Sequence, residues 1–151
     1  MPRIDIAAAP KRSGTGYPAP YDALCGGKTW SRLGEAAGLT QMGINLMRLP
    51  AGQWSSQRHW HTSEDEFVWV LEGEVILVEN DGETPLAAGD CAGFKAGDGN
   101  GHHLQNRSDR DAVLLVVGTT VPEGYAVHYP DIDLHLSTFQ GGYERKDGTA
   151  Y

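Results

Sequence analysis

The chain has 151 residues, the size of a single globular domain, and this length can bury a hydrophobic core without disulfides or a structural metal. Acidic residues outnumber basic ones 20 to 12, so the net charge is −8. Basic residues are adjacent only at Lys11-Arg12 and Arg145-Lys146. This charge balance excludes nucleic acid as an expected partner, because binding it requires a cationic face.

The cysteines and the N-terminus indicate the compartment. Cys25 and Cys91 are far apart and in no metal-binding spacing, which is typical of two reduced thiols. The first residues, MPRIDIAAAPKRSG, contain no continuous apolar run, so we expect neither a secretory signal nor a membrane span. We therefore expect a soluble, cytoplasmic protein.

Residues 1–39 have the composition of an arm that packs on a neighbouring domain. Four prolines lie within the first 20 residues, together with Gly14-Thr15-Gly16, and such a composition disfavours a helix. Residues 29–38 (TWSRLGEAAG) predict at most one short helical turn.

From residue 40 to residue 120 the pattern predicts strands. The segment 40–49 is compatible with one strand, and residues 67–80, 85–97 and 102–120 each predict a pair of short strands. Turn signals separate them at Glu72-Gly73, Asp81-Gly82, Gly89-Asp90 and between Asn106 and Asp111. Many short strands at close, regular spacing favour an all-β antiparallel sandwich or barrel.

Residues 121–151 form a different, aromatic segment with five tyrosine and phenylalanine residues. Only residues 131–137 (DIDLHLS) alternate like a strand, and His128 and His135 have no ligand-like spacing. We expect an aromatic extension of this kind to pack either on the barrel or on a second subunit. Together with the arm it exceeds what a small barrel needs for its core, so we predict a homodimer.

Two histidines, His59 and His61, are separated by one residue and precede Glu66. In an extended strand, residues two apart point to the same face, so both imidazoles project together, with Gln57 beside them. A turn through residues 62–65 then brings Glu66 in as the first residue of the next strand. Two imidazoles and one carboxylate that converge in this way make a first-row transition-metal site.

The spacing of these residues resembles the first sequence motif of the cupin superfamily. That motif places a glycine, His-x-His, a glutamate and a second glycine at fixed intervals, matched here by Gly52, His59, His61, Glu66 and Gly73. The second motif is matched by Gly89, Gly97, His102 and Asn106. The resemblance covers residues 40–120, with both motifs in order.

The chain departs from the family pattern at three places. Six residues instead of five separate Gly52 from His59, Lys95 stands where the family has proline, and four residues instead of two follow Gly97. The last difference leaves His102 and His103 as alternative ligands. The three-residue step to Asn106 favours His102, whereas His103 points to the other face of the same strand.

The resemblance implies a double-stranded β-helix, or jelly-roll barrel, that binds one divalent transition metal through His59, His61, Glu66 and His102. The donor set does not choose among iron, manganese, nickel, cobalt and zinc. Gln57 and Arg48 are the pocket candidates, with Lys95 near the barrel mouth. By alternation Val68, Val70 and Leu104 form either an apolar wall or core. Trp60 and Trp69 face away from the ligands, toward the arm or a dimer interface.

Three functions remain open for such a site. The first is a metal-dependent enzyme that acts on a small hydroxy-carbonyl, sugar-like or carboxylate metabolite by isomerase or lyase chemistry. Small bacterial cupins that resemble this chain include some called sugar-phosphate isomerase-like. The second is a non-haem iron dioxygenase. The third is a small-molecule-binding or sensing module without catalysis. The pattern identifies no general base.

Overall fold

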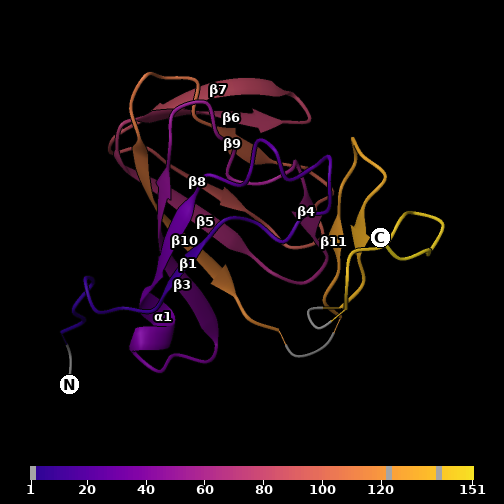
Figure 1. Ribbon diagram of the computed structural model, residues 1–151, viewed down its shortest axis with the longest axis horizontal. Helices are drawn as coiled ribbons and strands as arrows, with labels where there is room; N and C mark the ends of the chain where they lie inside the picture. The colour runs from indigo at the N-terminus through magenta and orange to yellow at the C-terminus, as the bar shows by residue number, and fades with distance from the viewer. Residues whose placement is uncertain (1–2, 122–123, 139–140) are drawn as a thin grey trace.

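The computed structural model describes residues 3–121, 124–138 and 141–151, which form antiparallel sheets and one helical turn (Figure 1). The largest sheet has six strands in the order β1-β2-β3-β10-β5-β8. Their bounds are Lys11–Ser13 (β1), Thr29–Arg32 (β2), Met42–Leu49 (β3), Ala112–Thr119 (β10), Glu66–Glu72 (β5) and Cys91–Phe94 (β8). Every strand pair in this sheet is antiparallel.

Two three-stranded sheets complete the barrel. One has the order β7-β6-β9, with β6 at Glu74–Glu79, β7 at Gly82–Ala87 and β9 at His103–Gln105. The other has the order β12-β11-β4, with β4 at Trp60–His61, β11 at Val127–His128 and β12 at His135–Leu136. Isolated bridges join the β4 segment to the β9 segment, because Trp54 pairs with Gln105 and His59 pairs with His102.

The main core lies between the large sheet and the β7-β6-β9 sheet. Strand β5 shows why: Val68 and Val70 are buried, whereas Phe67, Trp69 and Leu71 on the other face are exposed. Strand alternation dictates this division, so one face of the sheet supplies the core. The other core residues are Met47, Leu49, Val75, Leu77, Leu86, Leu104, Ala112 and Leu114.

The turn between β5 and β6 depends on Gly73. This residue has φ of 78°, a conformation that L side chains rarely adopt. A Cβ here would also lie 2.9 Å from the carbonyl oxygen of Asp111. The close approach keeps β5 next to the start of β10, where the β5–β10 register shifts between Val113 and Leu114.

These strands confirm the predicted all-β jelly roll. The predicted helical turn is also present, as α1 at Leu33–Ala36. Within the residues that the structure describes, no helix is long and apolar enough to cross a membrane.

The arm and the extension both take part in the sheets of the same chain. Residues 11–32 add two strands, β1 and β2, to the edge of β3. In the extension, β11 pairs with β4, and Val127, Tyr129 and Leu134 form a second core with tyrosine rings around it. The aromatic extension therefore covers the barrel of its own chain, shown in yellow in Figure 1.

Candidate metal centre

Three separate segments bring the site together. Strand β4 and the residue before it supply His61 and His59, β5 begins with Glu66, and His102 directly precedes β9. The backbone bridge between His59 and His102 holds the β4 and β9 segments at a fixed distance, with the His59 N to His102 O bond at 3.1 Å and its reciprocal at 2.8 Å. The ligand candidates are therefore set by sheet pairing, which is more rigid than a loop.

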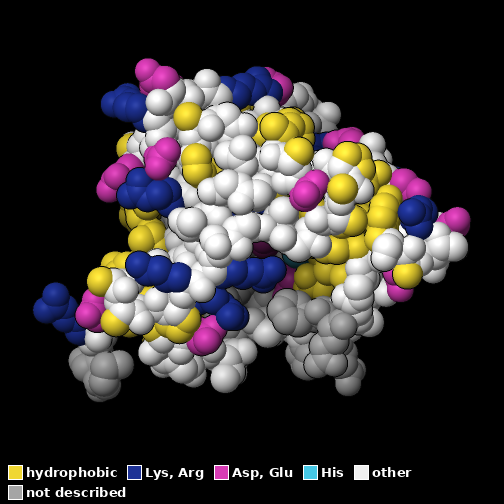
Figure 2. Space-filling view, viewed as in Figure 1, with side chains coloured by type: hydrophobic (Ala, Val, Ile, Leu, Met, Phe, Trp, Pro, Cys, Tyr) yellow, Lys and Arg dark blue, Asp and Glu magenta, His cyan; other side chains and the backbone are white. Residues whose placement is uncertain are grey.

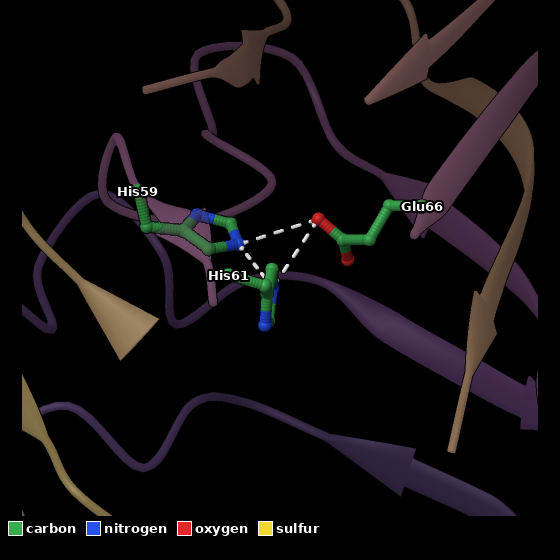
Figure 3. Close-up of side chains that lie close together, drawn as sticks. All are labelled: His59, His61 and Glu66. Atoms are coloured by element: carbon green, nitrogen blue, oxygen red, sulfur yellow. Dashed lines mark hydrogen bonds and ion pairs between the residues drawn. The ribbon is translucent and has the colours of Figure 1, made fainter. Parts of the chain in front are cut away.

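The imidazole Nε2 atoms converge on one carboxylate oxygen. Figure 3 shows His59 and His61 side by side, with Glu66 reaching toward them from the other side of a small gap. Glu66 Oε2 lies 3.6 Å from His59 Nε2, 3.3 Å from His61 Nε2 and 2.8 Å from His102 Nε2. The Nε2 atoms of His59 and His61 are 3.1 Å apart. This arrangement is compact enough for one ion to contact several of these atoms.

The second nitrogen of each ring is held by a neighbouring oxygen. His59 Nδ1 lies 2.9 Å from the carbonyl oxygen of Gln57, and His102 Nδ1 lies 3.3 Å from that of Asn100. Because a carbonyl only accepts, a proton on Nδ1 of each ring satisfies it, and this tautomer would direct the Nε2 lone pairs at a metal ion in the centre. Phe94 stacks on the His102 ring at 3.6 Å between centroids and fixes its plane.

His61 is held differently, by a second carboxylate. Its buried Nδ1 lies 3.2 Å from Glu64 Oε2, at ion-pair distance but without the alignment of a hydrogen bond. Burial alone would lower the pKa of His61, but Glu64 and Glu66 outweigh it and raise the pKa to about 9. Without an ion, His61 is therefore the charged histidine of the cluster at neutral pH.

In contrast to His61, His59 and Glu66 both have lowered pKa values. Burial lowers the pKa of His59, although Glu66 partly offsets it. Burial would raise the pKa of Glu66, but the imidazoles of His102, His59 and His61 around it hold that pKa well below its usual range. Glu66 is thus ionised and His59 neutral, which are the forms that bind a metal ion.

The structure places His102, and not His103, beside Glu66. His103 turns to the other side of the strand, where its Nδ1 donates to the Ser56 carbonyl at 2.9 Å and its Nε2 accepts from Gln105 at 2.9 Å. Trp54 packs edge-on against the His103 ring. Both nitrogens of His103 are therefore already engaged in the fold.

The cluster lies in a cavity of about 1390 Å³. His59, His61, Glu66 and His102 line it together with Glu64, and Val68 and Leu104 contribute apolar wall. Further walls come from the arm and the extension, through residues that include Arg12, Tyr17, Lys28, Trp30, Tyr125 and Tyr143. The cavity is large enough for a small metabolite.

Both predicted pocket residues lie outside this cavity. Gln57 is buried, and its amide donates to the Tyr21 carbonyl at 2.8 Å, because residues 55–58 are bends and not the extended strand that the alternation assumed. Arg48 is on the outer face of β3 and pairs with Asp111 at 3.2 Å, with 59% of its side chain exposed. Their prediction as pocket residues was wrong. Lys95 is exposed and does not line the cavity either.

Both tryptophans face away from the ligands as predicted, and the packing of Trp60 differs from expectation. Trp60 does face away from the ligands, but it stacks on His128 of the extension at 4.2 Å between centroids, and not on the arm. Trp69 is 44% exposed on the outer face of β5. Val70 belongs to the core alone, whereas Val68 and Leu104 serve both core and cavity wall.

Sequence reasoning missed the polar residues that the arm and the turn bring to the cavity. Glu64 was assigned to the turn, although its i,i+3 spacing from His61 was a signal for a contact. Lys28 and Arg12 lie more than 25 residues before the first histidine, and the local pattern gives no sign that they share its cavity. Only the pairing of β1 and β2 with β3 brings them there.

The donor set fits a divalent transition metal. His59 and His61, with Glu66, form a cluster that could hold a metal ion. The Nε2 atoms of His59 and His61 lie 3.1 Å apart, so once His61 loses its proton a cation between them would remove the repulsion between two lone pairs. The mixed nitrogen and oxygen ligands do not determine which metal binds.

Comparisons with known proteins agree with this geometry. Residues 45–118 match the Cupin domain family. The chain is 43% identical to a sugar phosphate isomerase from a cupin superfamily of Silicibacter pomeroyi DSS-3, over 99% of this chain and 96% of that one, with a TM-score of 0.92. It is 31% identical to a proposed sugar phosphate isomerase of Acidithiobacillus ferrooxidans ATCC 23270, over 78% of this chain and 74% of that one, with a TM-score of 0.72.

Fold and site together define a β-barrel protein with a cluster of histidine and carboxylate side chains that could hold a metal ion. The chain belongs to the cupin superfamily. No protein of established function in the curated collection matches it.

Proposed function

We propose that this chain is a metal-dependent isomerase of small phosphorylated sugars. The observation that carries the proposal is the convergence of imidazole Nε2 atoms and one carboxylate oxygen at a cavity of metabolite size. The similarity to a sugar phosphate isomerase over nearly the whole chain supports the reaction and the substrate class.

The residues that would bind the metal are His59, His61, Glu66 and His102. The ionised carboxylate of Glu66 and the carbonyl contacts at Nδ1 of His59 and His102 prepare these residues for this role without rearrangement of the backbone, whereas His61 must first lose a proton. When bound, the metal would polarise the carbonyl of a hydroxy-carbonyl substrate and make the neighbouring carbon more acidic.

Isomerisation also needs a group that moves a proton between adjacent carbons. Glu64 is the acid beside the cluster that is not one of the proposed ligands, and its side chain is 15% exposed in the cavity. We assign proton transfer to this carboxylate. Burial and the nearby Glu64 raise the pKa of Tyr125, so the phenol that it places on the cavity wall stays protonated.

The test compares His102→Ala with His103→Ala, together with wild type purified without added metal. We expect stoichiometric metal in wild type and in His103→Ala, and less than about a tenth of that in His102→Ala. Incubation of wild type with a panel of aldose and ketose phosphates, followed by NMR, should then show interconversion under anaerobic conditions. The His102→Ala variant should show none.

Two outcomes would contradict the proposal. Iron in the site with oxygen consumption, and no anaerobic turnover, would favour the dioxygenase. Metal binding without conversion of any phosphorylated sugar would favour a ligand-binding cupin that performs no chemistry.

A further inference from the structure

The N-terminal segment adds positive charge to a cavity that belongs to an acidic protein. Among the residues that line it, Arg12, Lys28 and Arg32 come from this segment, and all of them lie on or beside β1 and β2. In Figure 2, Lys and Arg side chains border the hollow in the centre of the view. Arg32 forms an ion pair with Glu35 at 2.7 Å. The charges of Arg12 and Lys28 have no such partner among the described residues.

Lys28 is a buried ammonium without a carboxylate partner among the residues that the structure describes. It is 5% exposed, and its Nζ donates to the Ser55 carbonyl at 2.5 Å. The rings of Tyr17 and Trp30 lie 5.9 and 5.7 Å from Nζ. A carbonyl and two aromatic faces offset only part of the cost of burying a charge. The ammonium of Lys28 therefore still lacks a negatively charged partner in the part of the chain that the structure describes.

Arg12 places a second cation at the same wall. It alternates with Lys11 along β1, and Arg12 lines the cavity whereas Lys11 does not. A Cβ on Gly16 would lie 3.8 Å from Arg12 Nη2 and 3.7 Å from Tyr143 Cε2, so the guanidinium sits over the loop of Gly14 to Gly16 next to a phenol ring. Arg12 has no ion pair with any residue of the described ranges.

The two cations are close enough to act on each other. Burial is the main reason that the pKa of Lys28 falls to about 8. Cys25 opposes this shift, and the charge of Arg12 adds a smaller lowering effect. Two like charges that face one cavity repel each other unless an anion lies between them. A doubly charged anion would offset both.

We propose that Lys28 and Arg12 form the subsite that binds the phosphate group of the substrate, while the sugar end reaches the histidine cluster. This inference rests on the proposed function for its substrate class. A phosphate monoester carries close to two negative charges at neutral pH and several acceptor oxygens, which match one ammonium and one guanidinium. Tyr17 and Tyr143, on the same wall, add phenol groups that burial keeps protonated.

The test measures binding of inorganic phosphate by calorimetry, to the metal-loaded protein and to the metal-stripped protein. We expect Lys28→Met and Arg12→Gln each to weaken phosphate binding by about tenfold or more, in both forms. Lys11→Gln on the opposite face of β1 and Arg48→Gln on the outer face of β3 are the controls, and each should stay within about twofold of wild type. Lys28→Arg should recover part of the loss.

Three results would overturn the subsite. One is equal phosphate binding by wild type, Lys28→Met and Arg12→Gln. Another is phosphate binding that disappears when the metal is stripped, because the anion would then be on the metal. The third is equal binding of acetate and phosphate, which would assign the site to carboxylates. Arg12 is exposed on an edge strand, so Arg12→Gln keeps the test decisive even if Lys28→Met misfolds.

Failure of the subsite and failure of the isomerase are separable. Phosphate binding that depends on Lys28 but occurs without turnover of any sugar phosphate would support the subsite and contradict the isomerase. Turnover that is insensitive to Lys28→Met and Arg12→Gln would support the isomerase and contradict the subsite.

Discussion

At the scale of single residues, the second nitrogen of each histidine decides its protonation. Carbonyl oxygens hold Nδ1 of His59 and His102, whereas His61 faces the carboxylate of Glu64. The cluster therefore combines the neutral ring of His59 with the ring of His61, which is protonated at neutral pH in the absence of an ion. The charged ring must lose its proton before it can bind a metal.

Metal binding is consequently expected to release about one proton at pH 7.5, and metal affinity should fall as the pH drops below about 9. Glu66 and His59 contribute little, since one is already ionised and the other already neutral. Calorimetry in buffers of different ionisation enthalpy gives the number of protons released. Glu64→Gln should reduce it by more than half, because the pKa of His61 falls when the neighbouring charge is removed. Unchanged release in Glu64→Gln, with Glu74→Gln as control, would show that another group carries the proton.

Lys28 makes the stability of the fold depend on pH, and this stability rises with pH. Its pKa is about 8 in the folded chain and about 10.5 when unfolded, so between these values the unfolded state binds more protons. Stability therefore gains roughly 3 kcal/mol from this group as pH rises from 8 to 10.5, and the full penalty applies below pH 8.

The variant Lys28→Met should lack this gain and should be more stable than wild type at pH 7. Chemical unfolding of both proteins between pH 7 and 10 measures the difference. If the stability of wild type and variant stays parallel over that range, Lys28 is not the buried cation that the structure describes. Saturating phosphate should reduce the difference, because a bound anion favours the charged ammonium.

At the scale of elements, strand β5 and its turn were well predicted from sequence. Alternation correctly placed Val68 and Val70 inside and Phe67 and Trp69 outside, because a strand within a sheet has a fixed period of two. The same rule failed at Gln57, since the chain there bends before β4 begins. Alternation also could not predict that Lys28 and Arg12 line the cavity, because their position depends on pairing between distant strands.

The turn at Gly73 offers a test of this element. We expect Gly73→Ala to destabilise the fold by about 2–4 kcal/mol, because the backbone conformation is strained for alanine and its Cβ would meet the Asp111 carbonyl. Gly38→Ala, with φ of 70° and open space, should show the strain alone, at about 1 kcal/mol. Gly142→Ala, with open space and no positive φ, should cost almost nothing. Equal losses in Gly73→Ala and Gly38→Ala would mean that the close approach to β10 is unimportant.

At the scale of the whole molecule, Arg58 joins the extension to the barrel. Its Nε donates to Asp131 at 2.7 Å, its Nη2 lies 2.6 Å from the other carboxylate oxygen, and its Nη1 donates to the Gly101 carbonyl at 3.2 Å. This forked contact fixes the extension beside the segment that leads to His102. The extension in turn carries Tyr125 and Tyr143 to the cavity wall.

Arg58→Met should therefore cost roughly 1–2 kcal/mol and should make the extension more susceptible to limited proteolysis. The matched control is Arg107→Met, which removes a forked contact to Glu83 between side chains that are each about half exposed. This control should leave cleavage of the extension unchanged. Equal protection in both variants would indicate that the aromatic core around Tyr129 holds the extension without Arg58.

The homodimer predicted from the arm and the extension stays a prediction. Both segments pack on the barrel of their own chain, so their presence no longer requires a second subunit. Sedimentation of the purified protein measures the oligomeric state directly.

The backbone bridge between His59 and His102 connects the proposed metal site with local opening of the barrel. The same two residues that face the centre also exchange both of their backbone hydrogen bonds, so their backbones cannot separate without opening the ladder between the β4 and β9 segments. Local opening at this pairing would move two of the proposed ligands apart together. A bound ion should therefore raise the free energy of this local opening, which hydrogen exchange at the amides of His59 and His102 measures.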